Sequence, residues 1–181
     1  MRLKIAALAL GIVVIASAVG ASAFTTASVD RTSTMDVVAD DAGLIALSPG
    51  NASTDLVRTG SNGQLTIDFT NSAASGVNGD STFSIGDNTT SSPTYAFNVT
   101  NNGAASHSFE LGYAFDNTDP SGDNVELAVY NSTGGYVGTA VDTTSTTFTA
   151  DPDETHYVVV SVDTTGLNNS TDLSGTVTVN A

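Results

Sequence analysis

Apolar residues alternate with polar ones in short runs along this chain, and this two-residue period constrains the fold more than any other feature. Successive side chains of a β-strand point to opposite faces of a sheet, so such alternation predicts half-buried strands. The runs that share one face are Leu65, Ile67 and Phe69; Tyr95, Phe97 and Val99; His107, Phe109, Leu111, Tyr113 and Phe115; Val125, Leu127 and Val129; His156, Val158, Val160 and Val162; and Leu173, Gly175, Val177 and Val179.

Turn-forming residues separate these runs. Glycine and asparagine tolerate positive φ and proline presets a bend, which favours tight turns. Such residues occur at Asn62-Gly63, Asn78-Gly79, Asn102-Gly103, Gly134-Gly135 and Asp119-Pro120-Ser121-Gly122. Strands at this spacing predict an all-β fold, a two-sheet antiparallel sandwich or jelly roll. Two stretches rich in small polar residues, 48–63 and 71–80, are expected to be long loops.

The N-terminus has the pattern of a secretory signal peptide over residues 1–23. Arg2 and Lys4 precede an uncharged apolar stretch, and Ala21-Ser22-Ala23 gives the small residues that a signal peptidase recognises. Cleavage there leaves residues 24–181 as a single β-sandwich domain. The alternative is a retained membrane anchor, because residues 5–23 approach the roughly 20 apolar residues that span a bilayer. Both alternatives predict a secreted or cell-surface protein, and cleavage predicts no stable membrane insertion.

The charge balance excludes several kinds of partner. The chain has 4 Lys+Arg against 19 Asp+Glu, a net charge of −15, and removal of Arg2 and Lys4 with the signal makes it −17. A surface this acidic repels nucleic acid and anionic lipid, so neither is expected as a partner. Repulsion among carboxylates is screened at about 1 M salt, where the Debye length is about 3 Å. Sixteen of the acids are Asp and lysine occurs once, which favours a protein adapted to high salt over an ordinary acidic exoprotein.

Cysteine is absent, so disulfide bonds cannot stabilise this exported chain. Its hydrophobic core must do so, and 158 residues after cleavage are enough for one domain of ordinary size.

Three phrases near the N-terminus carry a family resemblance. They are Gly20-Ala-Ser-Ala-Phe24-Thr-Thr-Ala-Ser-Val29-Asp30-Arg31, Met35-Asp-Val-Val38-Ala-Asp-Asp41 and Leu44-Ile-Ala-Leu47-Ser-Pro49, with weaker support from Phe97-Asn-Val-Thr-Asn-Asn-Gly103. Over residues 20–49 the chain resembles a haloarchaeal family of secreted proteins of unknown function, distantly similar to the TasA/camelysin group of extracellular fibre proteins. The resemblance implies that signal cleavage frees an N-terminal strand, which completes the sheet of a neighbouring subunit and builds a filament by donor-strand exchange.

The residues of this segment support two outcomes without the family. Within the N-terminal strand segment, residues 24–49, the positions Val29, Met35, Val37 and Val38 form an extended, largely apolar run near a free end. A terminal strand is mobile unless a sheet holds it. Insertion into its own sheet gives a monomer, whereas insertion into another subunit gives a head-to-tail homopolymer. The sequence leaves both outcomes open.

Known catalytic motifs are missing from the sequence, so we expect no enzyme. It contains no His-Glu-x-x-His helix, no Gly-x-Ser-x-Gly elbow and no cysteine nucleophile. His107 and His156 are the two candidates for a general base near neutral pH, and both begin apolar strand faces, where we expect a structural role. This differs from the zinc protease activity that the name camelysin suggests, because a zinc site needs about three protein ligands at suitable spacing.

One acidic loop could bind calcium. Asp116, Asp119, Asp123 and Glu126, with Asn117 and Asn124, place hard oxygen ligands on a loop containing proline and glycine, as calcium requires. The spacing does not match an EF-hand, and Asp is abundant in this chain. A solvated acidic loop is therefore the alternative, and no other cofactor is expected.

Six Asn-x-Ser/Thr sequons occur, and we expect at least one to carry a glycan in an exported protein. They are Asn51, Asn88, Asn98, Asn131, Asn168 and Asn169, and the last two are adjacent, so we expect only one of them to be used. Tyr130 and Tyr136 flank the turn that follows Asn131 and are the candidate pair for stacking on a sugar, although hairpin packing explains them equally well. Two functions remain in question: a structural subunit of the cell envelope or extracellular matrix, or a monomeric module that binds a glycan or another surface protein.

Overall fold

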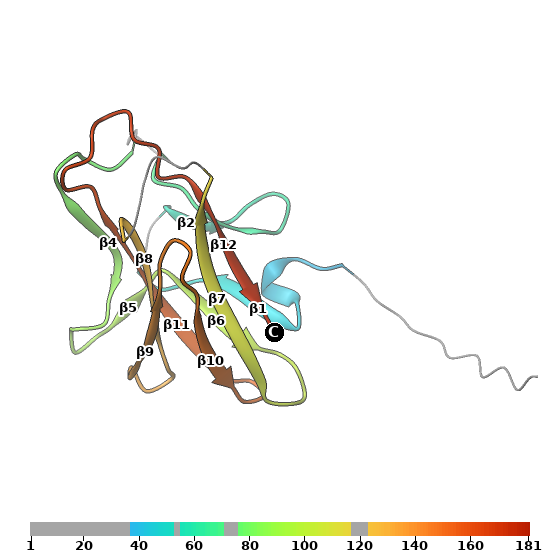
Figure 1. Ribbon diagram of the computed structural model, residues 1–181. Helices are drawn as coiled ribbons and strands as arrows, with labels where there is room; N and C mark the ends of the chain where they lie inside the picture. The colour runs from blue at the N-terminus through green and yellow to red at the C-terminus, as the bar shows by residue number, and fades with distance from the viewer. Residues whose placement is uncertain (1–36, 53–54, 71–75, 117–122) are drawn as a thin grey trace, which may run out of the picture. The chain divides into compact units, whose positions relative to one another are not determined.

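In the computed structural model, residues 37–52, 55–70, 76–116 and 123–181 are described (Figure 1). The predictions for the signal peptide, Val29, Met35 and Asp119 fall outside these ranges. The described elements are η1 (Asp40–Ala42), β1 (Ile45–Pro49), β2 (Val57–Thr59), β3 (Leu65–Ile67), β4 (Thr82–Asp87), β5 (Thr94–Tyr95), β6 (Phe97–Asn101), β7 (His107–Phe115), β8 (Val125–Tyr130), β9 (Tyr136–Ala140), β10 (Thr146–Ala150), β11 (Thr155–Asp163) and β12 (Gly175–Asn180).

The larger sheet is organised around β11. One edge of β11 pairs with β6 through His156 and Val158 and then with β4 through Val160 and Val162, while the other edge pairs with β8. Outward from these strands, β1 pairs with β6, β5 with β4, and β9 with β8. All of these pairings are antiparallel, so β11 is the central strand of the sheet.

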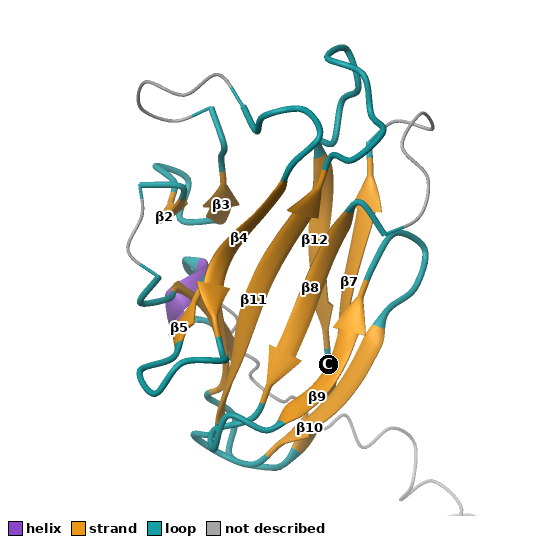
Figure 2. Ribbon diagram, turned by 90° about the vertical axis from the view of Figure 1, so that its left-hand side faces the viewer, coloured by secondary structure: helices purple, strands orange, loops and turns teal. Residues whose placement is uncertain are grey.

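The smaller sheet contains three strands in the order β10, β7, β12, also antiparallel. Figure 2 shows its strands on one side and β4, β11 and β8 on the other. The two sheets pack against each other, and the predicted all-β, two-sheet antiparallel sandwich is confirmed. A separate hairpin, β2 and β3, packs Val57, Leu65 and Ile67 against the core.

The core lies between the facing surfaces of the sheets. Alternate residues of β6, β7, β8 and β11 are buried there, as the two-residue period predicts. The fully buried side chains include Phe97, Phe109, Leu111, Leu127 and Val158. The sandwich closes along one side where β9 approaches β10: a Cβ added to Gly138 would lie 2.1 Å from Thr146 Oγ1, so only glycine fits without a shift of Thr146.

The prediction that Tyr95 shares a face with Phe97 and Val99 was wrong. Phe97 and Val99 face the core, whereas Tyr95 pairs with Gly86 and stacks on Tyr157, on the outer face of the larger sheet. The alternation breaks at Ala96, a bend where the chain leaves β4 and joins β11: the Ala96 N–H donates to Val158 O at 2.8 Å.

The loop predicted over residues 48–63 was also partly wrong, because Ser48 and Pro49 end β1 and residues 57–59 form β2. The described part of the second predicted loop, residues 76–80, contains no strand. Of the described glycines in the predicted turns, Gly63 and Gly134 have positive φ, each at 80°, whereas Gly79, Gly103 and Gly135 do not.

Asn101 is the most deeply buried polar residue among the described residues. Asn101, 1% exposed at the end of β6, donates from Nδ2 to Ala105 O at 2.8 Å and to Ala150 O at 2.9 Å. Its Oδ1 accepts from the Gly103 N–H at 2.9 Å. Because leaving a buried polar group without a partner costs free energy, these hydrogen bonds hold the β6–β7 turn against the end of β10.

Candidate functional site

A cavity of about 550 Å³ opens between the two sheets at one end of the sandwich. Its floor is formed by core residues of β8 and β11, Leu127 and Val160 among them, and Tyr113 of β7 lies on the opposite wall. The rim comes from the loop between β11 and β12, including Leu167, and from residues around Phe69. This end of the sandwich is therefore less completely filled than the rest.

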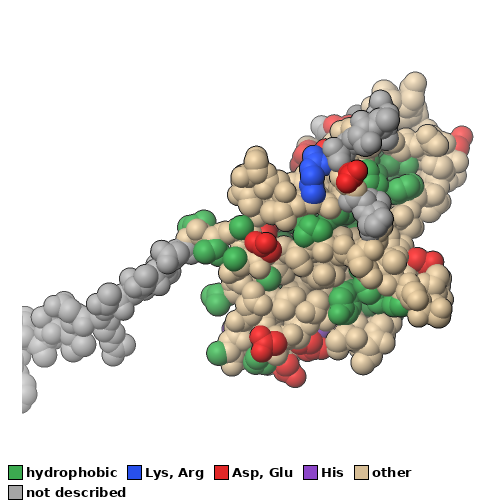
Figure 3. All heavy atoms as spheres, turned by 180° about the vertical axis from the view of Figure 1, so that it is seen from behind, with side chains coloured by type: hydrophobic (Ala, Val, Ile, Leu, Met, Phe, Trp, Pro, Cys, Tyr) green, Lys and Arg blue, Asp and Glu red, His purple; other side chains and the backbone are tan. Residues whose placement is uncertain are grey.

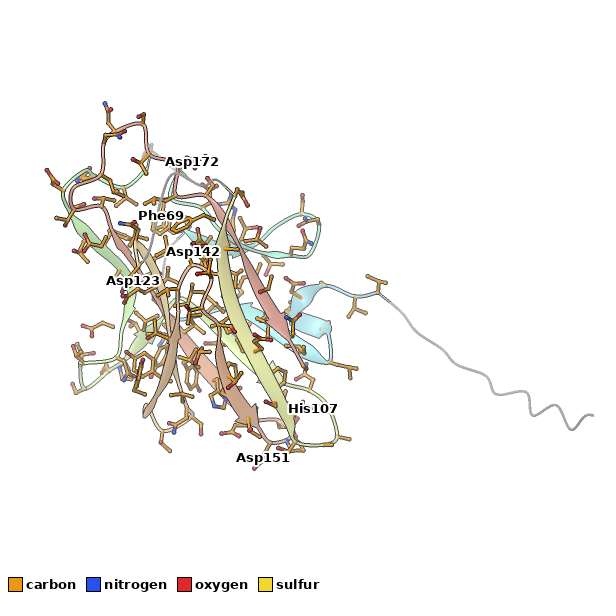
Figure 4. The ribbon with its side chains drawn as sticks, in the orientation of Figure 1. Phe69, His107, Asp123, Asp142, Asp151 and Asp172 are labelled. Atoms are coloured by element: carbon orange, nitrogen blue, oxygen red, sulfur yellow. The ribbon has the colours of Figure 1, made fainter. Side chains whose placement is uncertain are left out.

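Acidic residues give the mouth of this cavity a negative potential. The pKa of Tyr113 is raised to about 12 by burial and by the carboxylates of Asp116, Asp142 and Asp172. Its hydroxyl donates to Leu173 O at 2.7 Å, so the phenol is neutral at physiological pH. Figure 4 shows Asp142 and Asp172 at this end of the molecule, with Phe69. The surroundings disfavour an anionic ligand.

The two histidines differ in burial. His156 is 3% exposed, its ring lies 4.6 Å from that of Phe148, and its Nδ1 has no hydrogen-bond partner within the described ranges. Burial lowers the pKa of His156 against a smaller opposing effect of Glu154, so the ring is neutral. His107 is exposed at the start of β7, at the opposite end of the molecule from Asp172 (Figure 4).

Acidification from pH 7 to pH 5 is expected to destabilise the fold through His156. Its folded pKa lies below the unfolded value of 6.5, so this contribution to stability is fully present above pH 6.5 and is lost as pH falls toward the folded pKa. The limiting slope is about 1.4 kcal/mol per pH unit. Urea unfolding at fixed high salt measures this loss, which His156→Phe should abolish.

His107→Gln is the matched control, because it removes an exposed histidine and leaves the buried ring of His156 in place. Carboxylates act in a separate window: hydrogen bonds from Thr70, Thr89 and Thr165 hold the pKa values of Asp68, Asp87 and Asp163 below 3.8, so their contribution is lost only at lower pH. An equal slope in the His156→Phe variant would contradict the assignment.

The free edge of β12 and the N-terminal arm are the features relevant to assembly. Within the described chain no strand pairs with the outer edge of β12, and its inward residues Val177 and Val179 are only half-buried. Of the predicted assembly strand, Val37 is fully exposed and Val38 is 52% exposed. These two residues lie outside the core, just before η1, which the Asp40 N–H anchors to Gly63 O at 2.9 Å.

The described calcium candidates are not brought together. Asp116 follows β7 of the smaller sheet, whereas Glu126 lies on the outer face of β8 in the larger sheet, and Asp123 precedes β8. Across the described ranges, no three His, Cys, Asp or Glu side chains are grouped to hold a metal. Asp119 is outside those ranges, so the calcium site remains a prediction that calorimetry of calcium addition in multimolar salt can test.

Four tyrosines form a continuous cluster on the outer face of the larger sheet. Tyr95 stacks on Tyr157 with centroids 4.5 Å apart, Tyr130 lies 6.4 Å from Tyr95, and Tyr136 meets Tyr130 edge-on at 5.9 Å. Burial raises the pKa values of Tyr95 and Tyr130. Tyr136 is 63% exposed. The predicted pair, Tyr130 and Tyr136, is thus half of a larger aromatic group, which we call the tyrosine cluster.

The predicted sequons differ in what their side-chain amides do. Asn51 and Asn88 use Nδ2 as donors, to Pro93 O at 3.2 Å and Gly134 O at 3.0 Å. Asn98 is half-buried within β6, between β1 and β11. Asn131 and Asn168 instead use Oδ1 to accept from the N–H and hydroxyl two residues ahead, Thr133 and Ser170. Asn169 is exposed.

Comparisons with known proteins found no matching family model, no matching curated protein and no matching solved structure. No helix in the described ranges is long and apolar enough to cross a membrane.

Proposed function

We propose that this protein is a non-enzymatic, secreted structural subunit of the cell envelope or extracellular matrix, which assembles by donating its N-terminal strand to a neighbouring copy. The observation that carries the proposal is the outer edge of β12, beside half-buried Val177 and Val179, with which no strand among the described residues pairs. One additional strand along that edge would cover these side chains and satisfy the edge backbone groups, which proteins normally cover or use.

The strand that we propose for this edge is the segment 29–38 of a second copy. Its described end supports exchange over self-insertion, because Val37 and Val38 make no part of the core. Strand addition between copies is heterologous and need not close, so it gives an open polymer. The resemblance of residues 20–49 to TasA-like fibre proteins agrees with this assembly.

Deleting residues 24–36 is expected to abolish polymers of the mature protein while leaving most of the β-sheet signal in circular dichroism, because the described strands of both sheets begin at Ile45. Negative-stain microscopy and light scattering in multimolar salt measure the polymer. An added peptide with the sequence of residues 24–36 should bind the truncated protein by filling the free edge.

A matched pair of point variants separates strand donation from general hydrophobic association. Val37→Asp with Val38→Asp should prevent assembly, whereas Leu44→Asp, at a residue 77% exposed but outside the donated segment, should not. A deletion variant that polymerises as well as the parent would rule out strand exchange.

A second candidate function, a monomeric surface module that binds a ligand, is favoured by the 550 Å³ cavity with its apolar floor and acidic rim. A mature protein that stays monomeric at high concentration and high salt would favour this function over assembly.

A further inference from the structure

The turn between β8 and β9 presents a glycosylation sequon beside the tyrosine cluster. Asn131 directly follows Tyr130, the last residue of β8. Its backbone N–H donates to Gly135 O at 2.9 Å, which closes the hairpin directly before Tyr136. Asn88 joins this turn to the cluster: Nδ2 donates to Gly134 O at 3.0 Å and Oδ1 accepts from the Tyr95 hydroxyl at 2.8 Å. The turn is therefore fixed next to the aromatic rings.

The amide of Asn131 is held in one orientation. Its Oδ1 accepts from the Thr133 N–H at 3.0 Å, the Thr133 hydroxyl at 2.8 Å and the Gly135 N–H at 2.8 Å. No hydrogen bond within the described chain uses its Nδ2, the atom that N-glycosylation modifies. By contrast, Nδ2 of Asn51 and of Asn88 is engaged with a backbone carbonyl.

We propose that Asn131 carries an N-linked glycan whose first sugars pack on the exposed ring of Tyr136, so that the chain's own glycan covers the tyrosine cluster. In the transfer step, Nδ2 of Asn131 forms a bond to C1 of a sugar and loses a proton. The bond from C1 to a lipid-linked phosphate breaks, and the lipid phosphate leaves. The lipid-linked sugar is the co-reactant, and the proposal rests on the export that the proposed function requires.

Aromatic stacking is the physical reason for this arrangement. A sugar ring presents C–H groups that pack on the electron-rich face of an aromatic ring. Tyr136 is 63% exposed, although it is the outermost member of a packed aromatic group. Figure 3 shows several hydrophobic patches exposed on the molecule as seen from behind, with acidic groups near some of them. An uncharged glycan can cover such a face without adding to the negative charge.

Peptide mapping of the protein purified from its native cells tests the modification. Cleavage before aspartate releases residues 123–141, which contain Asn131 and no other sequon. We expect this peptide to carry the added mass of a glycan. Finding it only at the bare polypeptide mass would overturn the proposal, and this result is independent of whether the protein polymerises.

Nuclear magnetic resonance tests the packing on Tyr136. Protons of the first sugars should be shifted upfield by the ring and should return to ordinary shifts in Tyr136→Ser. Asn131→Asp removes the modified nitrogen but keeps an oxygen acceptor for the turn. Introduced into the parent protein, it should lower the unfolding midpoint, because the packing of the glycan on Tyr136 is lost. Introduced into the Tyr136→Ser variant, it should leave the midpoint unchanged, because that packing is already absent. Asn168→Asp is the matched control. The Oδ1 of Asn168 also accepts from the N–H and hydroxyl of the residue two positions ahead, but no residue of the tyrosine cluster flanks its turn. Unshifted sugar protons, or additive effects of the two substitutions, would overturn the packing.

Discussion

Replacing Asn101 with alanine is expected to lower the free energy of unfolding by about 2 to 4 kcal/mol, because the loss of one buried amide leaves three backbone groups without this partner. The buried carbonyl among them costs about 1 to 3 kcal/mol, and the two nearer the surface cost less, since water can replace the amide there. These groups are the Gly103 N–H and the carbonyls of Ala105 and Ala150. Urea unfolding at fixed high salt measures the change.

Two further substitutions interpret the result. Asn102→Ala removes one exposed hydrogen bond, from Nδ2 to Gly43 O, and should cost less than about 1 kcal/mol. Asn101→Asp keeps the acceptor for Gly103 but loses both donors and buries a charge, so it should be at least as harmful as alanine. Equal, small effects at residues 101 and 102 would contradict this role for Asn101.

Lowering the salt concentration from 1 M to 0.05 M is expected to reduce the melting temperature of a protein consisting of residues 24–181 by about 10 to 20 °C. Two unit charges about 10 Å apart repel by about 0.4 kcal/mol in water. Many such pairs in a domain of net charge −17 sum to several kcal/mol, and each kcal/mol corresponds to about 2 to 4 °C for a chain of this size. Within the described chain Arg58 is the one cation, and it already pairs with Asp68 at 2.9 Å.

The shape of the salt curve identifies the cause. Screening is nearly complete at about 1 M, so the melting temperature should rise steeply below that concentration and only slowly above it. Replacing the exposed Asp41, Asp123 and Asp151 with asparagine should make the low-salt part of the curve shallower. Curves that run parallel for parent and variant would show that repulsion is not responsible.

Sequence predicted the strands whose alternation reflects burial on one face. The inward residues of β8 and β11 were predicted correctly, because every second residue is apolar from Val125 to Val129 and from Val158 to Val162. Strands β9 and β10 were not predicted, because glycine and threonine interrupt their apolar pattern at Gly138 and Thr147. Pairing partners come from contacts far apart in the chain, and short local patterns do not encode them.

The candidate sites were predicted less completely than the fold. Tyr130 and Tyr136 were identified because they flank one turn, but Tyr95 and Tyr157 join them only through pairing among β4, β5, β8 and β11. A signal for Tyr157 existed in the sequence: Tyr157 and Val159 are apolar at positions where β11 should face solvent, which indicates cover on both faces of that strand.

The central position of β11 also determines when the fold can form. Strands β4, β6 and β8 all pair with residues 155–163, and none of the three pairs with another of them. During synthesis from the N-terminus, most of the larger sheet has been made before its central strand exists. Contacts over such long sequence separations form slowly. The larger sheet therefore cannot be completed until residues 155–163 have been made, although strand pairs that do not involve β11, such as β8 with β9, can form earlier.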